Sequence, residues 1–112
     1  MTDAPVGRDH SPASVAALIA MMNRRAGVDA RFARGEELHY LRAVEAAASH
    51  MYLGDGQSLI LVREDVATRA DALHEWLHRR LALRGAAVTV AEEHERIEDF
   101  LHRHRRILRL DG

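Results

Sequence analysis

Hydrophobic residues recur at helical spacing in four stretches of the chain, and a short region between the second and third stretch reads instead as β-strand. This pattern predicts amphipathic helices accompanied by a few short strands. The expected helices cover residues 12–26, 35–47, 69–84 and 90–109, and an additional short strand is expected over 28–33. The predicted fold class is α+β and mostly helical.

Local signals mark the boundaries of the first helix and of a hairpin. Ser11 is a suitable N-cap with Pro12 at the first helical position, and Gly27 is expected to close that helix in a left-handed conformation. Two β-like runs, 51–53 and 58–62, are separated by Gly54-Asp55-Gly56. Since Asp and Gly both tolerate positive φ, this segment predicts a β-hairpin.

The third helix carries the clearest chemical motif, His74-Glu75-Trp76-Leu77-His78, which has the form H-E-x-x-H. Residues four apart share one face of a helix, so both imidazoles can bind one Zn²⁺ ion. Glu75 would then lie beside the metal, outside its ligand set, as the base that takes a proton from bound water. The motif predicts a catalytic zinc site with His74 and His78 as ligands and Glu75 as the catalytic residue.

Two capping boxes strengthen that prediction, since they place the motif inside a well-defined helix. They are Thr68 with Asp71 and Thr89 with Glu92, and Gly85 between them ends the motif helix. Leu73, Leu77 and Leu81 form an apolar stripe beside the histidines, which should therefore lie at the edge of the core.

A third zinc ligand is expected from the last helix, because catalytic zinc sites usually have three protein ligands and one open position. Glu93 falls on the face defined by the apolar residues of that helix, where a carboxylate is costly unless something satisfies it. We predict Glu93 as the third metal ligand, with His94 as the main alternative and Glu98 as the next. A carboxylate that favours the helix start is almost as good an explanation of Glu93.

The amino-acid composition excludes several kinds of functional site. The chain has 112 residues and no cysteine, which excludes disulfides, thiolate ligands and a cysteine nucleophile. The net charge is −1, and all sixteen basic residues are arginine. Arginines at 103–106 suggest phosphate binding, but acids are interspersed among the basic residues, and Glu92 and Arg96 are spaced for an ion pair. No nucleic-acid partner is therefore expected. No membrane partner is expected either, because no apolar run approaches the roughly 20 residues that cross a bilayer.

The region from about 50 to 105 resembles the small zincin-like metallopeptidase domains of bacterial polymorphic toxins. The resemblance is carried by "SLILVRE", "ATRADALHEWLH", the helix-ending Gly85 and the acidic pair Glu93 and Glu95. It implies a minimal zincin-like fold, with a β-hairpin beside the motif helix and a ligand-bearing helix after it. It also implies a Zn²⁺-dependent peptidase with a protein or peptide substrate and, for a toxin, a cognate immunity protein. Arg79-Arg80 depart from such domains, which carry smaller or less charged residues there.

The organisation expected from the sequence is a flexible lead over 1–12 and a single domain over 13–112. The polar start does not resemble a signal peptide, so synthesis in the cytoplasm is expected, with export by a signal-independent system as an alternative. The main alternative to a peptidase is a non-catalytic helical interaction or immunity module, with or without a structural zinc.

Overall fold

The computed structural model describes residues 11–85 and 89–110. In chain order, the elements are α1 (Pro12–Met22), β1 (Val28–Phe32), α2 (Glu36–Ala43), β2 (Ala48–Gly54), β3 (Gln57–Val62), α3 (Arg69–Arg84) and α4 (Val90–Arg103). The predicted α+β class is confirmed. Of the predicted lead over 1–12, positions 1–10 lie outside the described residues, while Pro12 already begins α1.

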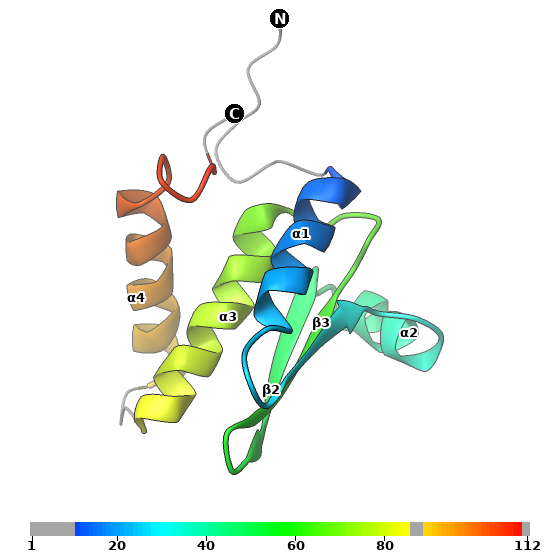
Figure 1. The fold of residues 1–112 in the computed structure, drawn as a ribbon, viewed down its shortest axis with the longest axis horizontal. Helices are drawn as coiled ribbons and strands as arrows, with labels where there is room; N and C mark the ends of the chain where they lie inside the picture. The colour runs from blue at the N-terminus through cyan, green and yellow to red at the C-terminus, as the bar shows by residue number, and fades with distance from the viewer. Residues whose placement is uncertain (1–10, 86–88, 111–112) are drawn as a thin grey trace, which may run out of the picture.

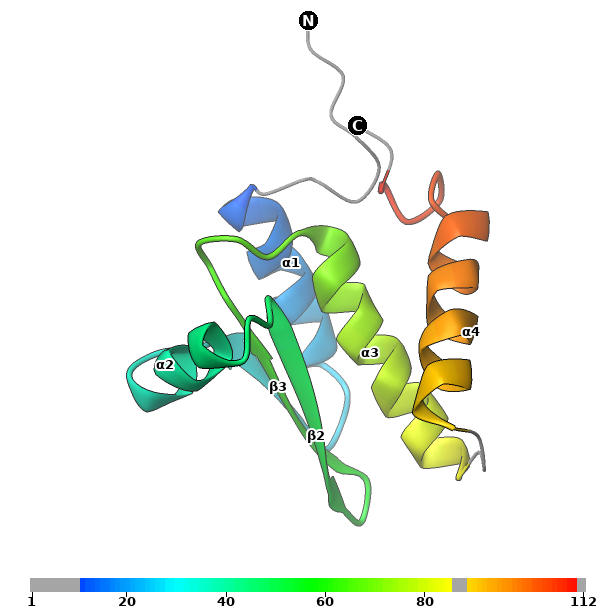
Figure 2. The ribbon, with the colours of Figure 1, turned by 180° about the vertical axis from the view of Figure 1, so that it is seen from behind.

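The strands form one sheet in the order β1-β3-β2, with β1 parallel and β2 antiparallel to the central strand. Helix α1 packs over β1, and α3 packs over β2 and β3 on the same side of the sheet. Helix α4 lies alongside α3, at the opposite end of the molecule from α2 (Figures 1 and 2). Among the described elements, α4 packs extensively only on α3.

The core lies between the sheet and the two helices that cover it. Ile60 and Val62 of β3 are fully buried, and they belong to one hydrophobic cluster with Leu18 of α1, Leu73 of α3 and Ile97 of α4. Because Leu73 points into this core, the next residue of α3, His74, lies at the core's edge, on the side where α4 packs.

The predicted hairpin is confirmed, and its turn explains a glycine outside it. Asp55 and Gly56 have φ values of 52° and 77°, the left-handed conformation that their residue types favour. Gly27 also has positive φ, but the prediction that it caps α1 is wrong. A Cβ at Gly27 would lie 2.4 Å from the carbonyl oxygen of Gly56. Gly27 thus permits a close approach to the hairpin turn.

Helix α1 ends earlier than predicted because Asn23 pairs with β1. Asn23 caps α1, its side-chain oxygen accepts from the Ala30 backbone N–H at 2.7 Å, and its amide donates to the Ala30 carbonyl at 2.8 Å. This bidentate contact turns the chain from the helix into the strand.

The last helix is also shorter than predicted, ending at Arg103 rather than near residue 109. The physical reason is tertiary packing: Leu110 is only 3% exposed and returns to the core, and Arg69 donates to the carbonyl of Leu108 at 2.9 Å. Arg109 has a φ of 60°, which breaks helical continuity and allows this return.

Arg79 holds the hairpin turn against α3. Its side chain is buried, donates to the Gly56 carbonyl at 3.1 Å and the Ala26 carbonyl at 3.4 Å, and lies 5.4 Å from the Trp76 ring centroid. Of the two arginines that depart from the zincin-like pattern, Arg79 is therefore turned toward the hairpin, and Arg80 is exposed.

We expect Arg79→Ala to lower the free energy of unfolding by about 2 kcal/mol, because the packing of a buried side chain and two partly buried, charged hydrogen bonds are lost. Arg80→Ala is the matched control: Arg80 is exposed, and its replacement should change stability by less than about 0.5 kcal/mol. Urea denaturation of both variants measures the difference. Equal midpoints for the two variants would show that Arg79 does not fasten the hairpin.

Candidate metal centre

Helix α3 is capped as its sequence predicts. Thr68 accepts from the Asp71 backbone N–H, the Asp71 carboxylate accepts from the Thr68 N–H, and Gly85 ends the helix in the left-handed conformation. His74 and His78 consequently lie one turn apart in a regular helix, with side chains 17% and 16% exposed. Both positions at the edge of the core agree with the prediction.

The two motif imidazoles face each other through the same ring atom. Their Nε2 atoms are 3.0 Å apart. The Nδ1 atom of His74 lies 2.7 Å from a Glu98 carboxylate oxygen, and that of His78 lies 2.5 Å from Glu93. Because an ionised carboxylate only accepts hydrogen bonds, both Nδ1 atoms are donors, and in the neutral rings both Nε2 atoms carry lone pairs.

Two lone pairs that face each other at 3.0 Å repel unless a cation or proton lies between them. Two nitrogens bound to one tetrahedral Zn²⁺ at 2.0–2.1 Å would be about 3.3 Å apart, close to the separation seen here. Burial also lowers the pKa of His74 below its usual value, despite the opposing effect of Glu98. The lowered pKa favours the neutral imidazole of His74, which is the form that binds a metal.

A third imidazole, from α4, completes the cluster. The ligand atoms of His74, His78 and His94 all lie within 4.8 Å of one another. The His94 ring centroid lies 5.0 Å from that of His74 and 4.8 Å from that of His78. Because His94 is exposed, its side chain has room to turn toward an ion shared with the other two imidazoles.

The structure places the three acidic and imidazole candidates of α4 in different roles. Glu93, predicted as the third ligand, contacts the far nitrogen of His78, and Glu98 contacts the far nitrogen of His74. The alternative candidate, His94, lies with the two motif histidines. The geometry thus favours His94 as the ligand, with both carboxylates orienting imidazoles.

Glu75 lies on the flank of the cluster that faces β2. Its carboxylate lies near the backbone of His50, an influence that on its own lowers the pKa of Glu75. Burial raises the pKa of Glu75 to about 6, since the low-dielectric surroundings outweigh the opposing influence of His78. A carboxyl group with a pKa near neutrality is suited to accept and return a proton.

A cavity of about 430 Å³ adjoins these groups. Its lining comes from α2 and the segment after it, from β2, and from the facing sides of α3 and α4. The lining residues are Tyr40, Leu41, Val44, Ala46, Ala48, Ser49, His50, Tyr52, Glu75, His78, Ala82, Glu93 and His94. Glu75 and two of the three clustered histidines therefore share one cavity with an edge strand of the sheet.

No protein-family model, curated protein or solved structure matches this chain. The zincin-like resemblance therefore gains no support from relatives, and the functional argument depends on the geometry of the site.

His50 is the residue near the site that sequence reasoning did not single out. Its Nε2 lies 3.0 Å from the hydroxyl of buried Ser58, and burial, reinforced by the nearby His78 and Arg79, lowers the pKa of His50 to about 4. The strand pairing that puts His50 opposite Ile60 turns its side chain toward α3. This placement depends on long-range register, and no local motif at residue 50 signals it.

Proposed function

We propose that this protein is a zinc-dependent metallopeptidase with His74, His78 and His94 as metal ligands and Glu75 as the general base. The observation that carries the proposal is the pair of Nε2 atoms 3.0 Å apart, each on a ring whose other nitrogen is held by a carboxylate. This arrangement orients two lone pairs toward one point, which is the role that carboxylate partners have in zinc sites.

Zinc fits this donor set best. Three imidazoles without thiolates match the ligands of catalytic zinc, which leaves the fourth position for water or substrate. When bound, zinc lowers the pKa of a coordinated water toward about 7 and polarises a substrate carbonyl. Glu75 lines the same cavity as His78 and His94, and there it would hold the displaced proton and deliver it to the leaving amine.

An extended peptide is the substrate that the cavity favours. Strand β2 is an edge strand, and Ala48, Ser49, His50 and Tyr52 of this strand line the cavity. The free side of an edge strand can pair with an added strand through backbone hydrogen bonds. A substrate held in this way would pass directly beside Glu75 and His78.

The first test is metal binding by protein purified without a histidine tag. We expect about one zinc per chain, and we expect zinc at 100 times its Kd to raise the free energy of unfolding by about 2.7 kcal/mol. For a chain of this size, the midpoint of thermal unfolding should rise by roughly 10 °C. Elemental analysis and calorimetry measure the two quantities.

His102→Ala is the control for this experiment, since His102 is exposed on α4 and is outside the histidine cluster. It should bind and respond to zinc as the wild type does. A wild-type protein that binds no zinc, and whose unfolding is indifferent to it, would end the proposal.

A structural zinc site without catalysis is the second candidate. It is favoured by one observation: α4 packs extensively only on α3, so an ion shared by His94 and the two α3 histidines would fasten α4 to the domain. This candidate predicts the same zinc content and stabilisation, and it assigns no proton transfer to Glu75.

A further inference from the structure

A second concave surface lies between α3 and α4 and shares no residue with the cavity beside the histidines. We call it the arginine groove. Its volume is about 320 Å³. Its floor is apolar, formed by Leu77, Leu81, Ile97 and Phe100.

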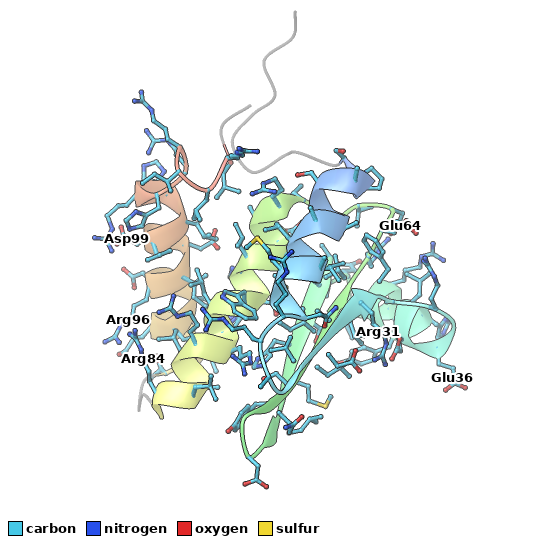
Figure 3. All side chains as sticks on the ribbon, viewed as in Figure 1. Arg31, Glu36, Glu64, Arg84, Arg96 and Asp99 are labelled. Carbon is cyan, nitrogen blue, oxygen red and sulfur yellow. The ribbon has the colours of Figure 1, made fainter. Side chains whose placement is uncertain are left out.

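The rim of the arginine groove carries positive charge that the described residues do not neutralise. Arg103 pairs with Asp99 at 3.0 Å, one turn away on α4. Arg80, Arg84 and Arg96 also line the groove, but none of their three side chains has an ion pair or hydrogen bond with another described residue. Arg84 and Arg96 lie close together on the side of the helix pair that faces away from the sheet (Figure 3).

Arg96 lacks the partner that helical spacing had predicted. Glu92 lies one turn before it, yet the Glu92 carboxylate accepts from the Thr89 backbone N–H and completes the capping box. The Glu92 carboxylate is thus turned to the helix start, and no ion pair joins it to Arg96 in the described part of the chain.

We propose that the arginine groove binds an amphipathic helix of a partner protein whose apolar stripe is flanked by Asp and Glu. Two neighbouring helices with an apolar seam that is open on one side form two thirds of a three-helix bundle, and a third helix would cover that seam. Uncompensated arginines on both helices then select acidic flanks and reject basic ones.

The apolar floor distinguishes this partner from a phosphate polymer or a membrane. Phosphate contacts need basic side chains but no apolar floor of Leu77, Leu81 and Ile97. The whole chain has a net charge of −1, which gives no long-range attraction to a polyanion. The inference goes beyond peptidase activity and does not depend on zinc.

The test uses a fluorescein-labelled synthetic helix of about 18 residues, with leucines at helical spacing and glutamates on both flanks. We expect fluorescence anisotropy to show binding to the full-length protein and weaker affinity as salt increases. The double variant Arg84→Glu/Arg96→Glu should weaken binding at least about tenfold. Arg24→Glu/Arg25→Glu, in the exposed turn after α1, makes the same charge change away from the groove and should leave binding unchanged.

Several results would overturn the proposal. They are no binding of the acidic helix at about 100 μM, equal binding of a lysine-flanked version, or equal affinity in both double variants. The proposal is also overturned if single-stranded oligo-dT or phosphatidylserine vesicles bind more tightly than the helix and Arg84→Glu/Arg96→Glu abolishes that binding. Zinc content should be unchanged in both double variants, because none of the substituted arginines belongs to the histidine cluster. If the acidic helix does not bind, the proposed metal site is therefore unaffected.

Discussion

Glu75→Gln is expected to keep about one zinc per chain while lowering the rate of peptide hydrolysis by about 10²–10⁴-fold, the usual contribution of a positioned general base. Gln preserves the shape of the side chain, but it cannot accept the proton. Zinc stoichiometry and cleavage of a quenched-fluorescence peptide library, measured on the same preparations, check both halves of the prediction.

The control for this substitution is Asp71→Asn, which changes a nearby carboxylate that caps the helix and lines no part of the cavity. It should cost some stability while hydrolysis per folded molecule stays within a few-fold of wild type. If Glu75→Gln hydrolyses peptides as fast as wild type, Glu75 is not the base. If the wild type binds zinc and cleaves nothing, the structural zinc site becomes the better explanation.

The raised pKa of Glu75 adds an expectation about this variant in the metal-free protein. A carboxyl group whose folded pKa is about 6, above its ordinary value of 4.5, binds more protons in the folded state between those values. Its contribution to stability is therefore fully present below about pH 4.5 and is lost as the pH rises through 6. Glu75→Gln should remove this contribution, so the variant's stability relative to wild type should increase across that interval.

Much of the scaffold could be predicted because it depends on neighbours in sequence. The capping boxes at Thr68 and Thr89, the left-handed cap at Gly85 and the Asp55-Gly56 turn all satisfy backbone groups within three or four residues. Local chemistry of this kind is visible in the sequence without knowledge of the fold.

The predictions that were wrong concern residues whose conformation is set by contacts with residues far away in the sequence. Gly27 suits a helix cap, but its conformation serves an approach to Gly56 in another element. The last helix has a helical pattern past Arg103, but burial of Leu110 draws the chain away from the helix axis. In both places a tertiary contact outweighs local propensity.

In the candidate site, too, the part set by local spacing could be predicted, and the part set by tertiary packing could not. The i, i+4 spacing of His74 and His78 fixes their common face, and the structure brings them together as expected. Helical phase alone placed Glu93 and His94 near the buried face of α4. The rotation of α4 against α3 decides that His94 joins the cluster of imidazole nitrogens while Glu93 contacts the Nδ1 atom of His78. That rotation depends on the packing of Ile97 and Leu101 on α3, which no spacing within α4 reveals.

The third ligand can be tested by comparing His94→Ala with Glu93→Gln. Structural zinc binds with about 10–16 kcal/mol shared among four ligands, so loss of one ligand should weaken affinity roughly 10²–10³-fold or more. Loss of a carboxylate that only orients an imidazole typically weakens affinity about 10–100-fold. We therefore expect His94→Ala to lower zinc affinity more than Glu93→Gln does, as measured by competition with a chromophoric chelator.

Glu98→Gln is the matched control, because Glu98 makes the same contact with His74 that Glu93 makes with His78. The two glutamine variants should lose affinity to a similar extent, with the smaller loss at Glu98, whose side chain is 66% exposed, against 25% for Glu93. The reverse order, with Glu93→Gln as damaging as a lost ligand and His94→Ala nearly neutral, would restore Glu93 as the third ligand. In that outcome the Glu93 carboxylate must leave the His78 Nδ1 atom on metal binding, and backbone relaxation of α4 would accompany zinc uptake.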